Sequence, residues 1–216
     1  MGGALPKQYL PLAGRTVLEH SLEVLLRQPR ISALVVAVCG GDQWWDGLRL
    51  DPAWPLLRVT GGEERCHSVL NGLRALAQRA AADDWVLVHD AARPCLRPSD
   101  LNALIDTLSD DPVGGLLAMP ACDTMKRADA GGRVAATVDR SGLWHAQTPQ
   151  MFRYRLLRDA LEAAVAQGAA VTDEASAVEA AGFRPRLVAG HAGNIKITHP
   201  DDLALAEFYL RQPRDY

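Results

Sequence analysis

Charged side chains follow an apolar run near the middle of the sequence. Asp90 comes shortly after the run Trp85–Val88, and Arg93 follows three residues later. Ligands of open α/β sheets bind at the carboxyl ends of strands, so we expect both groups in a binding crevice. A carboxylate there can accept from a substrate hydroxyl or hold a divalent ion, and a guanidinium can bind a phosphate. We favour this interpretation over a turn with a surface ion pair, and we interpret His89 as structural.

The segment Gly61–Ser68 lies between a predicted strand and a predicted helix. Glycines let the backbone approach a ligand closely, and a helix N-terminus favours anions. By itself, however, the segment is more typical of a tight turn followed by an N-cap. It also lacks the Gly-Lys-Ser/Thr ending of a P-loop, which excludes that nucleotide-binding motif.

Two lysines could also meet an anion. Lys196 lies in Asn194–Thr198, which predicts a strand, and a lysine in a buried strand needs an anionic partner such as a ligand phosphate. Lys7 lies near the start of the chain. Edge strands, a turn and a capped helix start are sufficient by themselves to explain four other polar clusters: Thr124–Arg127, Thr137–Arg140, Gln147–Gln150 and Thr172–Ser176. Motifs of serine hydrolases, zincins and dinucleotide-binding proteins are not found.

Strand-like and helix-like segments alternate along the chain. A capping box at Thr16–Glu19 begins a helix that Pro29 ends, and Ser99 is expected to cap a later helix. Apolar runs predict strands at 31–39, 56–60, 85–89, 113–119, 186–188 and 194–198. Apolar residues at helical spacing predict helices around 69–76, 101–108 and 154–167, with another from Thr172 and a last one opened by Pro200. This order predicts an α/β fold: a mostly parallel sheet with helices on both faces.

The stretch 122–150 interrupts that alternation. It contains short β-like pieces around 124–127, 133–138 and 143–148, and Ala130–Gly132 can turn a hairpin between the first two. A two-stranded ribbon is only marginally stable in water by itself. We therefore expect a protruding β-arm that meets a second subunit, which makes the protein a homodimer.

Composition limits the class of protein. The 216 residues predict one domain, 1–216, and the net charge of −3 gives no basic surface for nucleic acid or an anionic membrane. No apolar run is long enough to span a membrane, and the first residues do not resemble a secretory signal. The four cysteines form no Cys-x-x-Cys pair, so we predict reduced thiols, a cytoplasmic protein and no metal held by protein ligands.

Eight segments, taken together and in order, resemble the 2-C-methyl-D-erythritol 4-phosphate cytidylyltransferase family. They are Pro6–Tyr9, Gly62–Ser68, His89–Pro94, Asp123–Arg127, Thr137–Arg140, Thr148–Gln150, Thr172–Ser176 and Asn194–Lys196. The resemblance implies a Rossmann-like nucleotidyltransferase fold with a β-arm that clasps a second subunit. It also implies transfer of a cytidylyl group from CTP to methylerythritol phosphate in isoprenoid precursor biosynthesis. It further implies that pyrophosphate is released and that Mg²⁺ bridges the CTP phosphates.

The resemblance also implies roles for individual residues. Lys7 would stabilise charge on the triphosphate, Lys196 would act at the reacting phosphate, and the partner subunit would supply Thr124 and Arg140 to the substrate phosphate. We therefore expect catalytic roles for Lys7, Lys196 and Arg140. Substrate contacts are expected at Asp90, Arg93, Thr124, Arg140 and Thr148. Nucleotide contacts are expected at Gly62, Arg65, Ser68, Asp90 and Ala91.

The sequence departs from the family pattern at its start. The family begins with a strand and a glycine-rich loop that ends in Arg-Met, and Met1 falls at the position of that Met. We expect a missing beginning rather than an inactive relative. Two alternatives stay open at this point: a cytidylyltransferase for another polyol phosphate such as ribitol phosphate, and a non-catalytic nucleotide-binding homologue.

Overall fold

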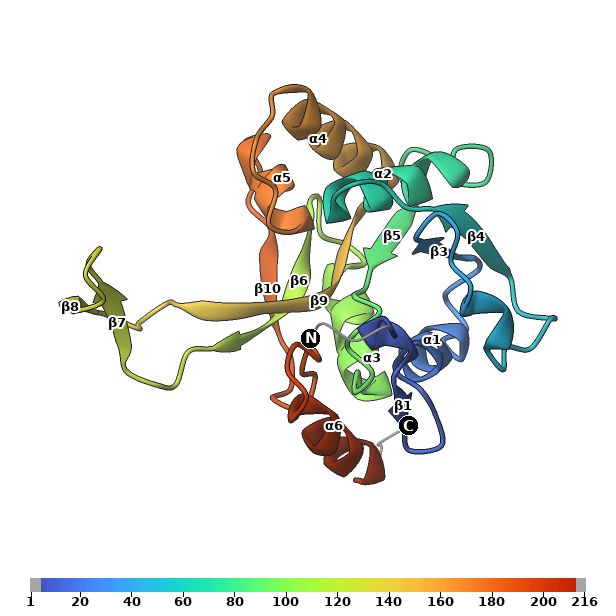
Figure 1. Ribbon diagram of the computed structural model, residues 1–216. Coiled ribbons are helices and arrows are strands. Elements are labelled where there is room, and N and C mark those ends of the chain that lie inside the picture. Colours follow the sequence, from blue (N-terminus) through green and yellow to red (C-terminus); the bar gives the residue numbers. More distant parts are fainter. Residues whose placement is uncertain (1–4, 213–216) are drawn as a thin grey trace.

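The first half of the chain confirms the predicted alternation of helices and strands. The computed structural model describes residues 5–212, so Met1 lies outside the described residues. A short 3₁₀ helix, Lys7–Tyr9, precedes the regular elements (Figure 1). These are β1 (Pro11–Leu12), β2 (Arg15–Thr16), α1 (Val17–Leu26), β3 (Leu34–Val38), β4 (Leu56–Thr60), α2 (Arg65–Ala75), β5 (Trp85–Val88) and α3 (Pro98–Leu108).

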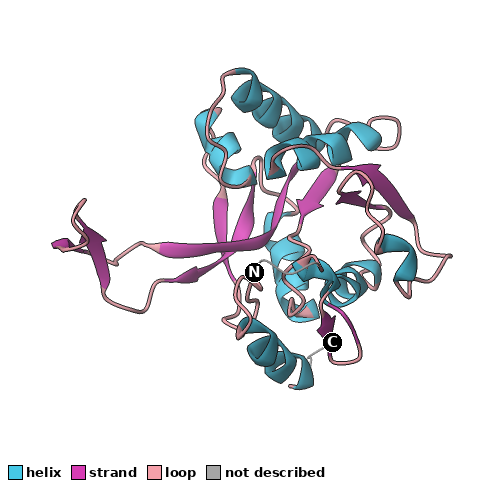
Figure 2. Ribbon diagram, viewed as in Figure 1, coloured by secondary structure: helices cyan, strands magenta, loops and turns pink. Residues whose placement is uncertain are grey.

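The second half adds a hairpin and three more helices. Its elements are β6 (Gly114–Pro120), β7 (Met125–Ala128), β8 (Val134–Val138), β9 (Trp144–Arg153), α4 (Tyr154–Ala166), α5 (Glu174–Ala180), β10 (Arg186–Ala189) and α6 (Asp202–Arg211). Figure 2 shows helices on either side of the central strands. Within residues 5–212, no helix combines the length and the apolar character that crossing a membrane requires.

The α/β class is confirmed, but the strands form mixed rather than mostly parallel sheets. The main sheet has the order β10-β6-β9-β5, and β3 and β4 form a separate parallel pair. β10 runs parallel to β6, whereas β9 runs antiparallel to both β6 and β5. The reason is the connection: the chain leaves the end of β6, makes a hairpin and returns beside it, and only an antiparallel strand can follow such a return.

Side chains of the main sheet alternate between two apolar cores. On β6, Leu116 packs in a core with residues of α2, α4 and α5, whereas the next residue, Leu117, packs in a core with α1 and α3. On β9, Phe152 and Met151 divide in the same way. Successive strand residues point to opposite faces, so helices cover the sheet on both sides, as predicted.

The hairpin β7–β8 lies away from the rest of the chain. Its strands pair antiparallel, and Figure 1 shows it at the far end of a ribbon formed by β6 and β9. The first two predicted pieces of the segment 122–150 therefore form a hairpin. The third piece does not: it belongs to β9, which continues to Arg153 inside the main sheet and is buried from Gln147 to Phe152.

Two predicted local features differ in the structure. Residues 194–198 form no strand; they run as an extended loop tied to the turn after β5 by the Ile197 N–H, which donates to the Ala92 carbonyl at 2.8 Å. Ser99 does not cap α3, which begins at Pro98 after Arg97. Proline is suited to the first helical position because its φ is already helical and it has no N–H to satisfy.

Candidate active site

Asp90 is the centre of a cluster of cations at the end of β5. The turn after the strand is closed by the Arg93 N–H, which donates to the Asp90 carbonyl at 3.0 Å. Asp90 Oδ1 accepts from Arg65 Nε at 3.0 Å, and Oδ2 lies 2.9 Å from Lys196 Nζ. Arg93 Nε lies 3.7 Å from the same Oδ2. One carboxylate therefore holds together cations from α2, from its own turn and from the loop 194–198.

Arg65 joins two carboxylates across the site. It is the first residue of α2, and its Nη1 and Nη2 donate to the two oxygens of Glu174 at 2.6 and 2.9 Å. Glu174, the first residue of α5, is fully buried. Burial raises the pKa of Glu174, and the hydrogen bonds from Arg65 oppose that shift. This bidentate contact has the geometry of an ionised pair, so Arg65 fixes α2 to both α5 and the Asp90 turn.

A chain of hydrogen bonds holds the Asp90 turn from behind. The Asp90 N–H donates to Thr148 Oγ1 at 3.0 Å, and Thr148 Oγ1 lies 3.0 Å from His89 Nδ1. His89 Nε2 lies 3.1 Å from the Arg93 carbonyl. A carbonyl can only accept, so Nε2 carries the proton and Nδ1 accepts from the Thr148 hydroxyl. His89 is therefore a structural side chain, as predicted.

Buried Asn194 ties the loop of Lys196 to this turn. Its side-chain Nδ2 donates to the Thr148 backbone carbonyl at 2.8 Å, and its backbone carbonyl accepts from Arg93 Nη1 at 2.6 Å. The loop needs no strand partner because these bonds fix it. Within the motif Asn194–Lys196, the hydrogen bonds of Asn194 therefore fix the backbone that carries Lys196.

The electrostatics of the cluster leave positive charge available for a ligand. Burial opposes ionisation of Asp90, but Arg65 and Lys196 outweigh it and lower the pKa of Asp90 to about 2. Burial and the nearby Lys196 lower the pKa of Lys7, and Asp90 opposes that shift, so Lys7 belongs to the same cluster. Four cations face two carboxylates: Lys7, Arg65, Arg93 and Lys196 against Asp90 and Glu174.

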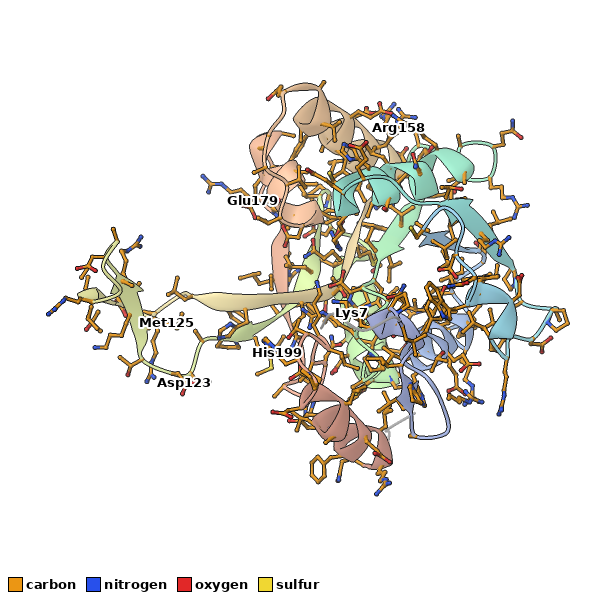
Figure 3. The ribbon with its side chains drawn as sticks, in the orientation of Figure 1. Lys7, Asp123, Met125, Arg158, Glu179 and His199 are labelled. Atoms are coloured by element: carbon orange, nitrogen blue, oxygen red, sulfur yellow. The ribbon has the colours of Figure 1, made fainter. Side chains whose placement is uncertain are left out.

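Lys7 reaches the cluster from the 3₁₀ helix at the start of the described chain. Tyr9, the last residue of that helix, is buried and donates through its hydroxyl to Asp42 Oδ2 at 2.7 Å. Figure 3 shows Lys7 near the middle of the molecule. This anchor positions a lysine that the sequence alone places only near the chain start.

In the loop before α2, the backbone of Gly62 lies close to the first turn of the helix. The Gly62 N–H donates to Ser68 Oγ at 3.0 Å, and the Ser68 hydroxyl donates to the Glu64 carbonyl at 3.2 Å. A Cβ on Gly62 would lie 2.3 Å from the Cβ of His67, so only glycine fits there. Gly62 is exposed, and the loop joins the Asp90 cluster through Arg65. Ala91 is exposed in the turn next to Asp90.

The structure does not bring Thr124 and Arg140 to this cluster. Both are exposed and flank the hairpin strands, and Arg140 Nη1 donates to the Cys122 carbonyl on the opposite side of the ribbon. In Figure 3 the neighbouring Asp123 and Met125 lie far to one side of Lys7. Within one chain, the predicted site residues therefore form two separate groups.

Glu174 and Asn194 complete the hydrogen bonds of this cluster, and the sequence alone assigns neither side chain to the site. The segment Thr172–Ser176 predicts a capped helix start, and the cap is present: Asp173 accepts from the Ser176 N–H at 2.9 Å. A cap accounts for Asp173 but gives the adjacent Glu174 no role. A signal was available, because a helix start with two acidic residues needs only one of them as its cap.

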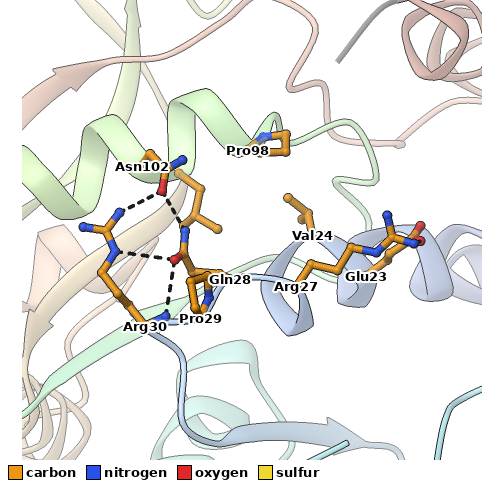
Figure 4. A pocket seen from close by; sticks show the side chains of 9 residues that line it. Glu23, Val24, Arg27, Gln28, Pro29, Arg30, Pro98 and Asn102 are labelled. Atoms are coloured by element: carbon orange, nitrogen blue, oxygen red, sulfur yellow. Dashed lines mark hydrogen bonds and ion pairs between the residues drawn. The ribbon is translucent and has the colours of Figure 1, made fainter. Parts of the chain in front are cut away.

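A cavity of about 650 Å³ lies elsewhere, between the end of α1 and the start of α3 (Figure 4). No residue that lines it belongs to the predicted site. Its polar side chains bond to one another: Arg30 donates to Asn102 at 2.7 Å, and Gln28 donates to the same Asn102 oxygen at 2.8 Å. Volume alone therefore does not locate the chemistry in this chain.

His89 makes the stability of the site pH-dependent. Burial lowers the pKa of His89 from an ordinary 6.5 to about 4. Between these two pKa values the folded state therefore binds fewer protons than the unfolded state. The free energy of unfolding is at its full value above pH 6.5 and decreases as the pH falls toward 4. We expect a loss of about 3 kcal/mol in the free energy of unfolding over that range, from about 1.4 kcal/mol per pKa unit.

Urea unfolding of the native protein and of His89→Gln across this pH range measures the effect. The difference between the two proteins isolates His89 from the carboxylates that titrate in the same range. His199→Gln, a change at an exposed histidine, is the control and should follow the native protein. Parallel pH profiles for native and His89→Gln proteins would contradict the assignment.

Comparisons with known proteins agree over nearly the whole chain. The family model for 2-C-methyl-D-erythritol 4-phosphate cytidylyltransferase matches residues 1–212. Proteins of that name from Vibrio vulnificus (strain YJ016) and Pseudomonas entomophila (strain L48) are 53% and 56% identical over 210 and 213 residues. These spans are 97% and 98% of this chain and 89% of each relative.

Solved structures also match this chain over nearly its whole length. A crystal structure of a 4-diphosphocytidyl-2C-methyl-D-erythritol synthase has a TM-score of 0.84 and 44% identity, and the match covers 94% of both chains. The 2-C-methyl-D-erythritol 4-phosphate cytidylyltransferase of Francisella tularensis has a TM-score of 0.86 and 36% identity, over 96% of this chain and 94% of the other. The chain belongs to the 2-C-methyl-D-erythritol 4-phosphate cytidylyltransferase family.

Proposed function

We propose that the Asp90 cluster is one half of an active site that two chains build together. As a member of its family, the enzyme transfers a cytidylyl group from CTP to 2-C-methyl-D-erythritol 4-phosphate in isoprenoid precursor biosynthesis and releases pyrophosphate. The comparisons do not favour another polyol phosphate or a non-catalytic homologue. The observation that carries the proposal is the surplus of two positive charges around Asp90, which suits a triphosphate.

The reaction needs position and charge rather than a nucleophilic side chain. A phosphate oxygen of the substrate forms a bond to the α-phosphorus of CTP, and the bond from that phosphorus to the bridging oxygen of pyrophosphate breaks. In the transition state, negative charge develops on the oxygens of the α-phosphate and on the leaving oxygen of pyrophosphate. Lys7 and Lys196 stabilise this charge as preorganised donors. Asp90 orients Lys196 by direct contact.

The segment Gly62–Ser68, which includes the first turn of α2, and the turn after β5 form the nucleotide side of the proposed site. Gly62 and Ser68 read the cytosine, and Arg65 holds the loop against Asp90. Exposed backbone at Gly62 and Ala91 supports this assignment, because a ligand can approach without displacing side chains. Arg93 and Thr148 fix the turn and lie on the side of the methylerythritol phosphate.

The proposed Mg²⁺ is carried by the triphosphate rather than by a protein cage. Both oxygens of Asp90 are already engaged by cations, so this carboxylate is a poor metal ligand. Mg²⁺ commonly keeps several waters and binds through substrate phosphates, which fits such a site. When bound, the ion neutralises charge on the phosphates; Lys7 and Lys196 do the same from the protein side.

We further propose that the arm 122–150 clasps the arm of a second subunit and delivers Thr124 and Arg140 to the substrate phosphate. Exposed apolar side chains along the ribbon support this: Val134 is 65% exposed, and Leu143 and Trp144 are each 37% exposed. A partner that covers them would remove apolar surface from water. The Rossmann-like classification and the cytoplasmic location stay predictions.

Arg140→Ala tests the shared site. A charge-assisted contact to phosphate contributes roughly 1.5–3 kcal/mol, so the KM for methylerythritol phosphate should rise by about tenfold or more. CTP binding should stay unchanged, because the proposed CTP contacts lie in the other group of residues. Pyrophosphate release by the full-length protein, with each substrate varied in turn, measures both effects. Arg133→Ala is the control for loss of charge, because Arg133 is also an exposed cation of the hairpin.

Subunit mixing gives the sharper version of this test. A mixed dimer of Arg140→Ala and Asp90→Ala has one site with both defects and one intact site. In a two-fold symmetric dimer, random exchange of equal amounts should therefore restore about a quarter of the native sites. Mixing Asp90→Ala with Lys196→Ala should restore nothing, since both changes fall in the same group. Equal results for the two mixtures would exclude the shared site.

A further inference from the structure

Three side chains with different metal-binding atoms meet at the start of α2. The ligand atoms of Glu64, Cys66 and His67 all lie within 4.8 Å of one another. Cys66 Sγ lies 3.7 Å from Glu64 Oε2. In a tetrahedral zinc site, neighbouring sulfur and oxygen ligands are about 3.5 Å apart, as follows from bond lengths of about 2.3 and 2.0 Å. Small side-chain rotations would therefore suffice to bring all three onto one ion.

The local structure makes these side chains available. Glu64 is the N-cap residue of α2, yet its carboxylate makes no capping hydrogen bond and instead faces Cys66. Glu64 is exposed, His67 is half-buried and Cys66 is buried with a free thiol. An ion could thus reach the group from solvent and still contact a thiol that packs against the core.

The chemistry of the donor set selects the kind of ion. Carboxylate, thiolate and imidazole are together the ligands of zinc, whereas Mg²⁺ prefers oxygen ligands alone. A helix N-terminus disfavours a bare cation, but two anionic ligands more than balance an effective half charge. Arg65 is close in sequence, yet it is already paired with Asp90 and Glu174 and so does not occupy the Glu64 carboxylate.

We propose that Glu64, Cys66 and His67 form a binding site for one Zn²⁺ ion, with water in the fourth position. This site is separate from the Mg²⁺ that accompanies the nucleotide. Cys66 and His67 lie in the first turn of α2 and Glu64 directly precedes it, so a bound ion ties the start of α2 to the loop before it. The absence of a Cys-x-x-Cys pair predicts no protein metal site, but the folded helix start brings these three ligand atoms together.

Cobalt titration of the nucleotide-free, reduced protein tests the site. Co²⁺ bound by a thiolate gives a near-ultraviolet charge-transfer absorption, and we expect it to saturate at one ion per chain. Zn²⁺ should abolish the absorption, and excess Mg²⁺ should not. Cys66→Ser should eliminate the absorption. Glu64→Gln and His67→Asn should each weaken Co²⁺ binding by about tenfold or more, because one of three protein ligands is lost.

Exposed thiols elsewhere provide the control. Cys39→Ser and Cys122→Ser each remove an exposed cysteine and should leave the absorption intact. Circular dichroism verifies folding, and the half-buried His67 gives a variant that does not disturb the core if Cys66→Ser unfolds. The proposal is overturned if the native protein shows no thiolate band, if the band persists in both Cys66→Ser and His67→Asn, or if Mg²⁺ displaces the cobalt.

Discussion

Lys196→Ala is expected to lower the kcat of the full-length enzyme by about 10²–10³, with little loss of stability. Removing one preorganised donor aimed at developing charge typically has a cost of this size. Lys196 contacts Asp90 at 2.9 Å, which fixes its ammonium in place before substrate binds. Asp90 keeps Arg65 as a partner in the variant, so the turn after β5 should survive. Single-turnover measurement of pyrophosphate release separates this effect from weakened binding.

Arg211→Ala is the matched control for Lys196→Ala. It also removes a cation from an ion pair with a carboxylate, Glu207, but on the exposed surface of α6. We expect no measurable change in kcat for this variant. A Lys196→Ala enzyme that turns over at the native rate, or one whose entire loss lies in the KM for CTP, would contradict a role for Lys196 in the transition state.

Glu174→Gln is expected to lower the free energy of unfolding by about 3 kcal/mol and to raise the KM for CTP. Breaking a buried ion pair by removing one partner costs roughly 3–5 kcal/mol, because a charge is left without its counterion. The lower end applies here, since Arg65 is one-third exposed and keeps Asp90. Arg65 would lose its bidentate anchor to α5, and the segment Gly62–Ser68 that it holds would be less ordered. Urea unfolding and steady-state kinetics measure the two effects.

The comparison variant for Glu174→Gln is Glu162→Gln. It neutralises the carboxylate of an exposed pair in which Arg74 Nη2 lies 3.6 Å from Glu162 Oε1, and such pairs contribute about 0–1 kcal/mol. Glu174→Asp, which keeps the charge but shortens the side chain, should recover part of the stability. If Glu174→Gln were no more destabilising than Glu162→Gln, the Arg65 contact would not be what positions the loop.

Features that depend on neighbours in sequence were predictable from sequence alone. The capping box at Thr16–Glu19 is present at the start of α1, and β4 occupies the predicted range Leu56–Thr60. Caps, turns and apolar periodicity act over a few residues, so their physical basis is contained in the local sequence. The alternation of elements therefore fixed the α/β class, and the order of eight segments indicated the family.

Only the tertiary structure decided which of these residues meet. Arg65 and Glu174 are separated by 109 positions, and nothing near either residue indicates the other. The direction of β9 depends on where the chain returns after the hairpin, and the loop at 194–198 is held by Asn194 rather than by strand pairing. A buried charge or amide needs a partner wherever the fold brings one, and that partner is chosen by packing between distant elements. The local pattern therefore predicted the residue types of the site but not its hydrogen bonds.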